Sequence, residues 1–127
     1  MNIYDAVRDE LVANAAVAAI VSTRIYANLL PQKPTLPAIS YQQISQADAS
    51  EGSAELFVAR YQVNCYATKY MAAAALADAV VDALRDWGDL SVAPAVIQTR
   101  DVSRLDDYDE ATETHRVILD FLFWICD

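Results

Sequence analysis

Several residue types on which enzyme sites are commonly built are scarce in this chain. It has two glycines, two cysteines and a single histidine, His115. Two glycines are too few for a glycine-rich phosphate-binding loop, and Cys65 and Cys126 form no CxxC pair. The local signatures of serine hydrolases and zinc proteases are also missing. We therefore expect no catalytic residues, no metal site and no cofactor, and we predict that the chain is not an enzyme. The two thiols are expected to be free.

Basic residues are few as well. Nine Lys and Arg stand against eighteen Asp and Glu, which gives a formal charge of −9, and no basic run occurs. A surface of that sign repels phosphate groups. We therefore expect no specific binding of nucleic acid and no attraction to an anionic membrane.

Long apolar runs are lacking too. No segment reaches the ~20 consecutive apolar residues that span a bilayer, and Asp5, Asp9 and Glu10 interrupt the N-terminal region, so no signal peptide is expected. At 55% hydrophobic residues, the composition nevertheless excludes a disordered chain. The length predicts one domain, residues 1–127.

Helical periodicity appears in three places. Ile3, Val7 and Leu11 share one face of a helix predicted over residues 2–14, and an alanine-rich stretch at 15–22 predicts a second, short helix. The main helix is predicted over residues 69–87 and ends at Gly88. Its predicted buried stripe consists of Ala73, Ala77, Val80, Leu84 and Trp87.

Alternation of apolar and polar residues predicts strands at 24–27, 38–45, 57–67, 95–105 and 115–125. Ile44 breaks the alternation of the second strand, and a β-bulge is one cause of such a break. Polar loops are predicted at 46–55 and 106–114. The predicted fold is α+β: an antiparallel sheet of about four to five strands with a long hairpin, packed against two main helices.

The last predicted strand is apolar on both faces. Its odd positions are apolar throughout, and Ile118, Leu122 and Trp124 also place apolar side chains on the even face. An exposed antiparallel strand would keep that face polar. Two explanations remain: either helices cover both sides of the sheet, or this face meets another subunit.

Two predicted loops are acidic. Asp48, Glu51 and Glu55 belong to the first, which either is a solvated hairpin tip or faces a partner or a channel. In the second, the carboxylates of residues 106–113 are of the type that binds Ca²⁺, but the spacing of an EF-hand is missing. A solvated turn is the favoured interpretation there.

The order and spacing of several segments resemble the tail-completion, or tail-terminator, proteins of tailed bacteriophages and phage-derived particles. These segments are RIY at 24–26, LPAISYQ at 36–42, RYQVNCY at 60–66, ALA at 75–77, ETHR at 113–116 and LDF at 119–121. The resemblance extends over nearly the whole chain. It carries no catalytic residues with it.

The resemblance implies a structural virion protein, made in the bacterial cytoplasm, that caps the tail tube as a homo-oligomeric ring, most simply a hexamer. Its implied partners are further copies of itself, the tail tube protein and a head connector or stopper protein, while DNA passes through without specific binding. Ile118, Leu122 and Trp124 are then candidates for the subunit interface, and Asp48, Glu51 and Glu55 for the lumen or a partner-facing loop. The alternative is a monomeric adaptor that binds a single protein partner.

Overall fold

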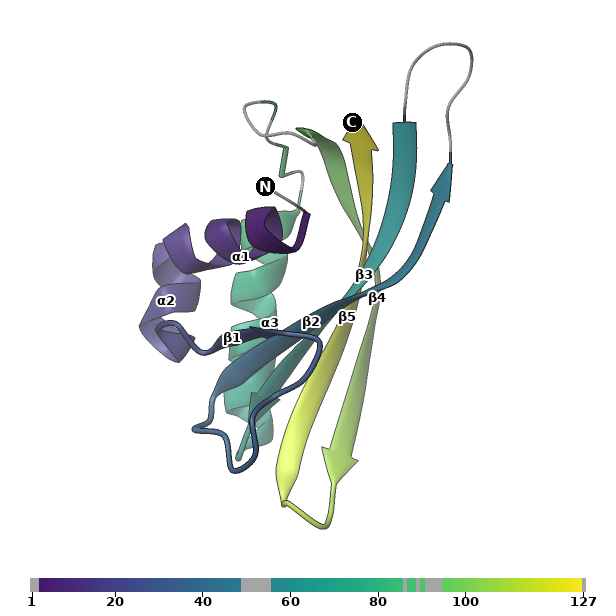
Figure 1. Cartoon of the computed structure of the whole chain (residues 1–127). Coiled ribbons are helices and arrows are strands. Elements are labelled where there is room, and N and C mark those ends of the chain that lie inside the picture. The colour runs from purple at the N-terminus through teal and green to yellow at the C-terminus, as the bar shows by residue number, and fades with distance from the viewer. Residues whose placement is uncertain (1–2, 49–55, 86, 89, 91–94, 127) are drawn as a thin grey trace.

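The computed structural model describes residues 3–48, 56–85, 87–88, 90 and 95–126 (Figure 1). Within them the chain forms three helices and five strands, which are α1 (Ile3–Ala13), α2 (Ala15–Val21), β1 (Ile25–Ala27), β2 (Ala38–Asp48), β3 (Leu56–Ala67), α3 (Tyr70–Leu84), β4 (Ala95–Asp109) and β5 (Thr114–Cys126). The strands form one sheet in the order β1-β2-β3-β5-β4. All three helices lie on the same side of this twisted sheet (Figure 1).

The predicted α+β fold is confirmed, but the sheet is mixed and not wholly antiparallel. β1 runs parallel to β2, with Ile25 beside Ile39 and Ala27 beside Tyr41. The strand ends at Ala27, because the next residue, Asn28, has a left-handed backbone with φ of 68°. The proline-containing connector that follows brings the chain back to the end of the sheet where β1 began. The next strand therefore starts in the same direction.

Both predicted polar loops are shorter than expected. β2 continues to Asp48 and β4 continues to Asp109, so part of each acidic segment is strand. In both cases pairing with the neighbouring strand extends past the point where the apolar alternation stops, because strand formation depends more on neighbours than on local composition. The suspected bulge at Ile44 is confirmed by a register shift between Gln43 and Ser45.

The main helix is also shorter than predicted. It ends at Leu84, because Arg85 has an extended backbone with ψ of 128°. Trp87 therefore lies outside the helix, but it is buried as expected. Its ring meets that of Phe123 edge to face at 5.8 Å between centroids, which is a favourable aromatic geometry.

The core lies between the helices and one face of the sheet. The odd positions of β5, from Val117 to Ile125, are buried there, as predicted. α3 packs against them through small side chains such as Ala73 and Ala77 together with Leu76, all fully buried. Alanines let the helix axis lie close to the strands, so that the larger β5 side chains fill the space between the two layers.

Three polar contacts join α3 and the residue that follows it, Arg85, to the edge strand β4. The hydroxyl of Tyr70 donates to Asp106 over 3.0 Å, Arg104 pairs with Asp78 at 2.7 Å, and Arg85 pairs with Asp101 at 3.2 Å. The hydrogen bond from Arg85 also lowers the pKa of Asp101. Exposed ion pairs stabilise a fold by only ~0–1 kcal/mol each. Their main effect here is to turn the charged side chains of β4 toward the helix.

We expect Leu76→Ala to lower the free energy of unfolding by about 2–5 kcal/mol, because it leaves a cavity between α3 and the sheet. Chemical denaturation followed by circular dichroism measures this loss. Met71→Ala is the matched control: Met71 lies in the same helix but is 75% exposed, so its loss should change the stability by less than about 0.5 kcal/mol. Equal effects of the two substitutions would contradict the assignment of Leu76 to the core.

Candidate assembly surfaces

The face of the sheet that points away from the helices is the first candidate surface. No helix of the described part of the chain covers it (Figure 1). Ile118, Leu122 and Trp124 lie on this open face and are each half-buried by their neighbours in the sheet. The sequence-based alternative in which helices cover both sides of the sheet is therefore wrong. The apolar residues at the even positions of β5 therefore lie on the protein surface.

Polar groups flank the middle of this apolar row. The registers place Leu122 between Arg60 of β3 and Arg100 of β4, and they place Asp120 between Gln62 and Ser103. Asp120 accepts hydrogen bonds from Arg60 at 3.1 Å and from the Ser103 hydroxyl at 2.8 Å. Among the described residues, Asp120 is the only carboxylate in the middle of this apolar row, and Arg60 of the same subunit neutralises its charge.

A buried polar chain lies beside Ile118 on the same face. The side-chain amide of Asn64 donates to the Ser40 hydroxyl at 3.3 Å, and Ser40 in turn lies 3.4 Å from the hydroxyl of Tyr66. Ser40 and Asn64 are almost completely buried. The Asn64 Oδ1 atom has no hydrogen-bond donor among the described residues. Sequence reasoning missed this polar cluster, because nothing in the alternation of β3 distinguishes Asn64 from an exposed asparagine.

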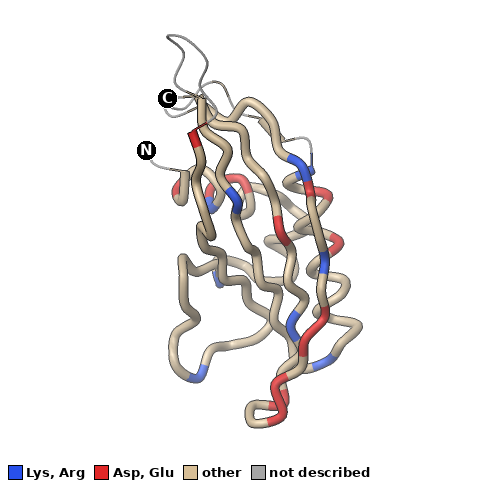
Figure 2. Tube along the Cα trace, turned by 90° about the vertical axis from the view of Figure 1, so that its right-hand side faces the viewer, with Lys and Arg blue, Asp and Glu red and all other residues tan. Residues whose placement is uncertain are grey.

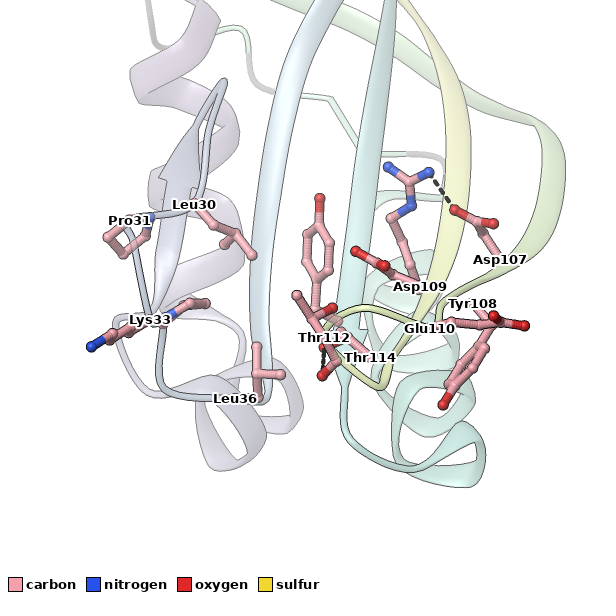
Figure 3. Close-up of a pocket in the computed structure, with 13 residues that line it drawn as sticks. Leu30, Pro31, Lys33, Leu36, Asp107, Tyr108, Asp109, Glu110, Thr112 and Thr114 are labelled. Carbon is pink, nitrogen blue, oxygen red and sulfur yellow. Dashed lines mark hydrogen bonds and ion pairs between the residues drawn. The ribbon is translucent and has the colours of Figure 1, made fainter.

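A cleft of about 790 Å³ lies at the other end of the sheet, between the connector and the β4–β5 hairpin (Figure 3). Leu30, Pro31 and Leu36 line one side, while Tyr108, Glu110 and Thr112 line the other. Arg116 pairs with Asp107 at 2.6 Å within it. The cleft therefore combines apolar side chains of the connector with charged and hydroxyl side chains of the hairpin.

Acidic residues cluster along the chain at the β4–β5 turn, at one end of the molecule (Figure 2). Several of them are already engaged: Asp106 with Tyr70, Asp107 with Arg116, and Asp109 with the backbone N–H of Ala111 at 3.0 Å. Within the described ranges, no group of three or more potential metal ligands comes together.

His115, Cys65 and Tyr41 are held in place by packing, burial and a hydrogen bond within the fold. The His115 ring packs against Tyr108 at 4.6 Å and against Tyr70 at 6.0 Å between centroids. Burial raises the pKa of the Cys65 thiol, which keeps it protonated and unreactive. Burial also raises the pKa of Tyr41 to about 12, and its hydroxyl donates to the backbone oxygen of Tyr4 at 2.9 Å.

None of the described helices has the length and apolar character to cross a membrane.

Comparison with models of known protein families matches residues 5–126 to one family, described as Tail completion protein gp17. The chain belongs to the tail completion protein gp17 family. This membership confirms the resemblance drawn from the order of the sequence segments. It makes the chain a structural component of a phage virion or of a phage-like particle, associated with the tail.

The fold of this tail completion protein also occurs in a solved structure. A chain from the "Virion of native gene transfer agent (GTA) particle" has a TM-score of 0.82 and 24% sequence identity, and the match covers 95% of this chain and 92% of that one. At this level of identity the likeness establishes the fold alone. A search of curated proteins gave no match.

The acidic residues predicted to face a lumen or partner lie only partly within the described structure. Asp48 is exposed at the end of β2, where its neighbour in β3 is Phe57. Glu51 and Glu55 lie outside the described residues. The structure therefore places one of the three, Asp48, at the last residue of β2. Ile118 is level with Ser40, near the other end of that strand.

Proposed function

We propose that this tail completion protein caps the end of the tail tube as a homo-oligomeric ring, most simply a hexamer. The ring ends tail assembly and offers the surface to which the head, through its connector or stopper protein, is joined. The observation that carries the proposal is membership of the tail completion family over residues 5–126. The protein acts by assembly and not by catalysis, in keeping with the packing of the His115 ring between tyrosines and the burial of Cys65.

The open face of the sheet supports assembly with other subunits. A closed ring requires two different and complementary surfaces on each subunit. Ile118, Leu122 and Trp124 form an apolar row on a face with no helix over it, and Asp120 between them is already neutralised. Covering this row removes apolar area from water without leaving a bare charge buried. We assign it to the contact between subunits.

The excess of negative charge suits a channel for DNA. Repulsion between carboxylates and phosphates lets a DNA duplex pass without adhering to the wall. We place Asp48, Glu51 and Glu55 at the lumen or at a partner-facing rim, because Asp48 lies exposed at the end of a hairpin that extends past the helices (Figure 1).

Removing the protein from its particle tests the proposed function. Particles assembled without it should have tails of uncontrolled length, or separate tails and heads, because nothing ends the tube or joins it to the head. Negative-stain imaging measures tail lengths and the fraction of joined particles. Particles with tails of normal length and attached heads would rule the function out.

Trp124→Glu is expected to give a folded protein that no longer assembles, because it places a charge in the proposed subunit contact. Circular dichroism reports folding, and light scattering together with incorporation into particles reports assembly. Met71→Glu, on the exposed side of α3, is the matched control and should assemble normally. An unfolded Trp124→Glu variant, or one that assembles like the control, would contradict this role for Trp124.

Replacing Asp48, Glu51 and Glu55 together by lysine should impair DNA ejection and infectivity while the ring stays intact, because the reversed charge attracts the phosphates of DNA. The matched control carries Asp48→Asn, Glu51→Gln and Glu55→Gln, which removes the repulsion without adding attraction, so its loss of infectivity should be smaller. Normal titres of the lysine variant would show that these residues do not line the DNA path.

A further inference from the structure

The two edges of the sheet differ in how far the fold covers them. One edge is β2, whose first half is occupied: β1 pairs with it from Ile39 to Tyr41, and Asn28 donates to the backbone oxygen of Tyr41 at 2.7 Å. Next along the strand, the N–H of Gln43 donates to the Tyr4 hydroxyl at 2.9 Å. Beyond Gln43, no further strand lies beside β2 in the described part of the chain.

Among the described residues, the uncovered half of β2 has one protective feature of an edge strand, the bulge at Ile44, but no lysine, proline or covering segment. Residues 44–48 are all exposed, and the first four of them, Ile44 to Ala47, carry no charge and include no proline. Soluble proteins commonly protect such an edge with lysine, proline or a covering segment, because its free N–H and C=O groups would otherwise pair with another chain. In the part of the chain that the structure describes, Ile44 to Ala47 thus form an uncharged and uncovered edge in a protein with a net charge of −9.

The opposite edge is β4, and it is exposed from Arg100 to its end at Asp109. This segment is rich in charge, but its charged side chains are directed back into the subunit. Arg104 pairs with Asp78 of α3, Asp101 pairs with Arg85 just after α3, and Asp107 pairs with Arg116 of β5. Among them stand apolar side chains that are open to solvent: Val102 is 39% and Leu105 is 62% exposed. The backbone of this edge is thus left accessible.

The directions of the two edges fit each other. Each of the steps β2 to β3, β3 to β5 and β5 to β4 is antiparallel, so β4 runs opposite to β2. Rotating a second copy about an axis inclined to the strands brings its β4 beside β2 as an antiparallel neighbour. The inclination is required because the registers set Ser45 to Ala47 level with Gln98 to Arg100, so the part of β4 beyond Arg100 must shift along the strands to meet them. Each copy offers one edge of each kind, so the contact repeats from subunit to subunit and can close into a ring.

We infer that residues 44–47 of β2 in one subunit pair with the exposed part of β4, residues 100–109, in the next subunit. The occupant of each edge is a second copy of this chain, and a continuous sheet joins the subunits. The contact also reaches the open face, because Leu105 lies beside Ile118 in the register of β4 and β5. The inference rests on the proposed ring and specifies which backbone segments hold it together.

Pairs of introduced cysteines test this contact. In a Cys126→Ser background, each of Ser45→Cys, Gln46→Cys and Ala47→Cys is combined in turn with Val102→Cys and with Leu105→Cys, which covers neighbouring registers. Cys65 is retained because it is buried. Within one subunit β3 and β5 separate these positions by roughly 14 Å, three strand spacings, whereas a disulfide needs Cα atoms within about 7 Å. Any disulfide therefore joins two subunits.

Oxidised particles that carry the best pair should show a ladder of covalent oligomers on a non-reducing gel, which collapses to monomer on reduction. The control pair Leu29→Cys with Val102→Cys places one thiol on the exposed connector and should leave the protein monomeric. Absence of a ladder from every pair, in particles that contain the protein, overturns the inference. Dimers formed by a variant with Val102→Cys alone also overturn it, since they show β4 pairing with itself. Tail length and head attachment, measured separately, decide the proposed function, so the two failures are distinguishable.

Discussion

One-sided coverage of the sheet is the constraint on which the rest of the structure depends. The three helices bury the odd side of β5 and its neighbours, so nearly all of the core lies in a single layer between helix and sheet. The same arrangement leaves the other side of the five-stranded sheet without a helical layer, so its side chains must be stabilised by contacts with one another. On that side the protein uses cross-strand ion pairs, a buried amide chain and a row of half-buried apolar residues in place of a second layer.

Much of the fold could be predicted from local periodicity. The alternation in residues 57–67 and 115–125 located two of the central strands, and the alanine-rich stripe located α3. Ile44 indicated a bulge because its parity conflicts with that of Ile39 and Tyr41. In each case a single face of one element is buried, and burial of one face is what produces a readable pattern in the sequence.

The parts that escaped prediction depend on contacts between distant residues. The parallel β1–β2 pair follows from the path of the connector, and the extension of β4 through DDYD follows from pairing with β5, neither of which is encoded locally. The even side of β5 drew attention to Ile118, Leu122 and Trp124, but the sequence left open which side the helices cover. The polar cluster at Asn64 and the cleft at the connector left no pattern at all, because each forms from segments far apart in the chain.

The pairing of β3 with β5 has a consequence for how the chain reaches its folded state. These adjacent strands are separated along the chain by α3 and β4, and the contact of Arg60 with Asp120 spans 60 residues. On either side of this junction the paired strands are close in sequence: β1, β2 and β3 on one side, and the β4–β5 hairpin on the other. Closing such a long loop is entropically costly, and topologies with distant pairings fold slowly. We therefore expect the joining of these two halves to limit the rate at which subunits become ready to assemble.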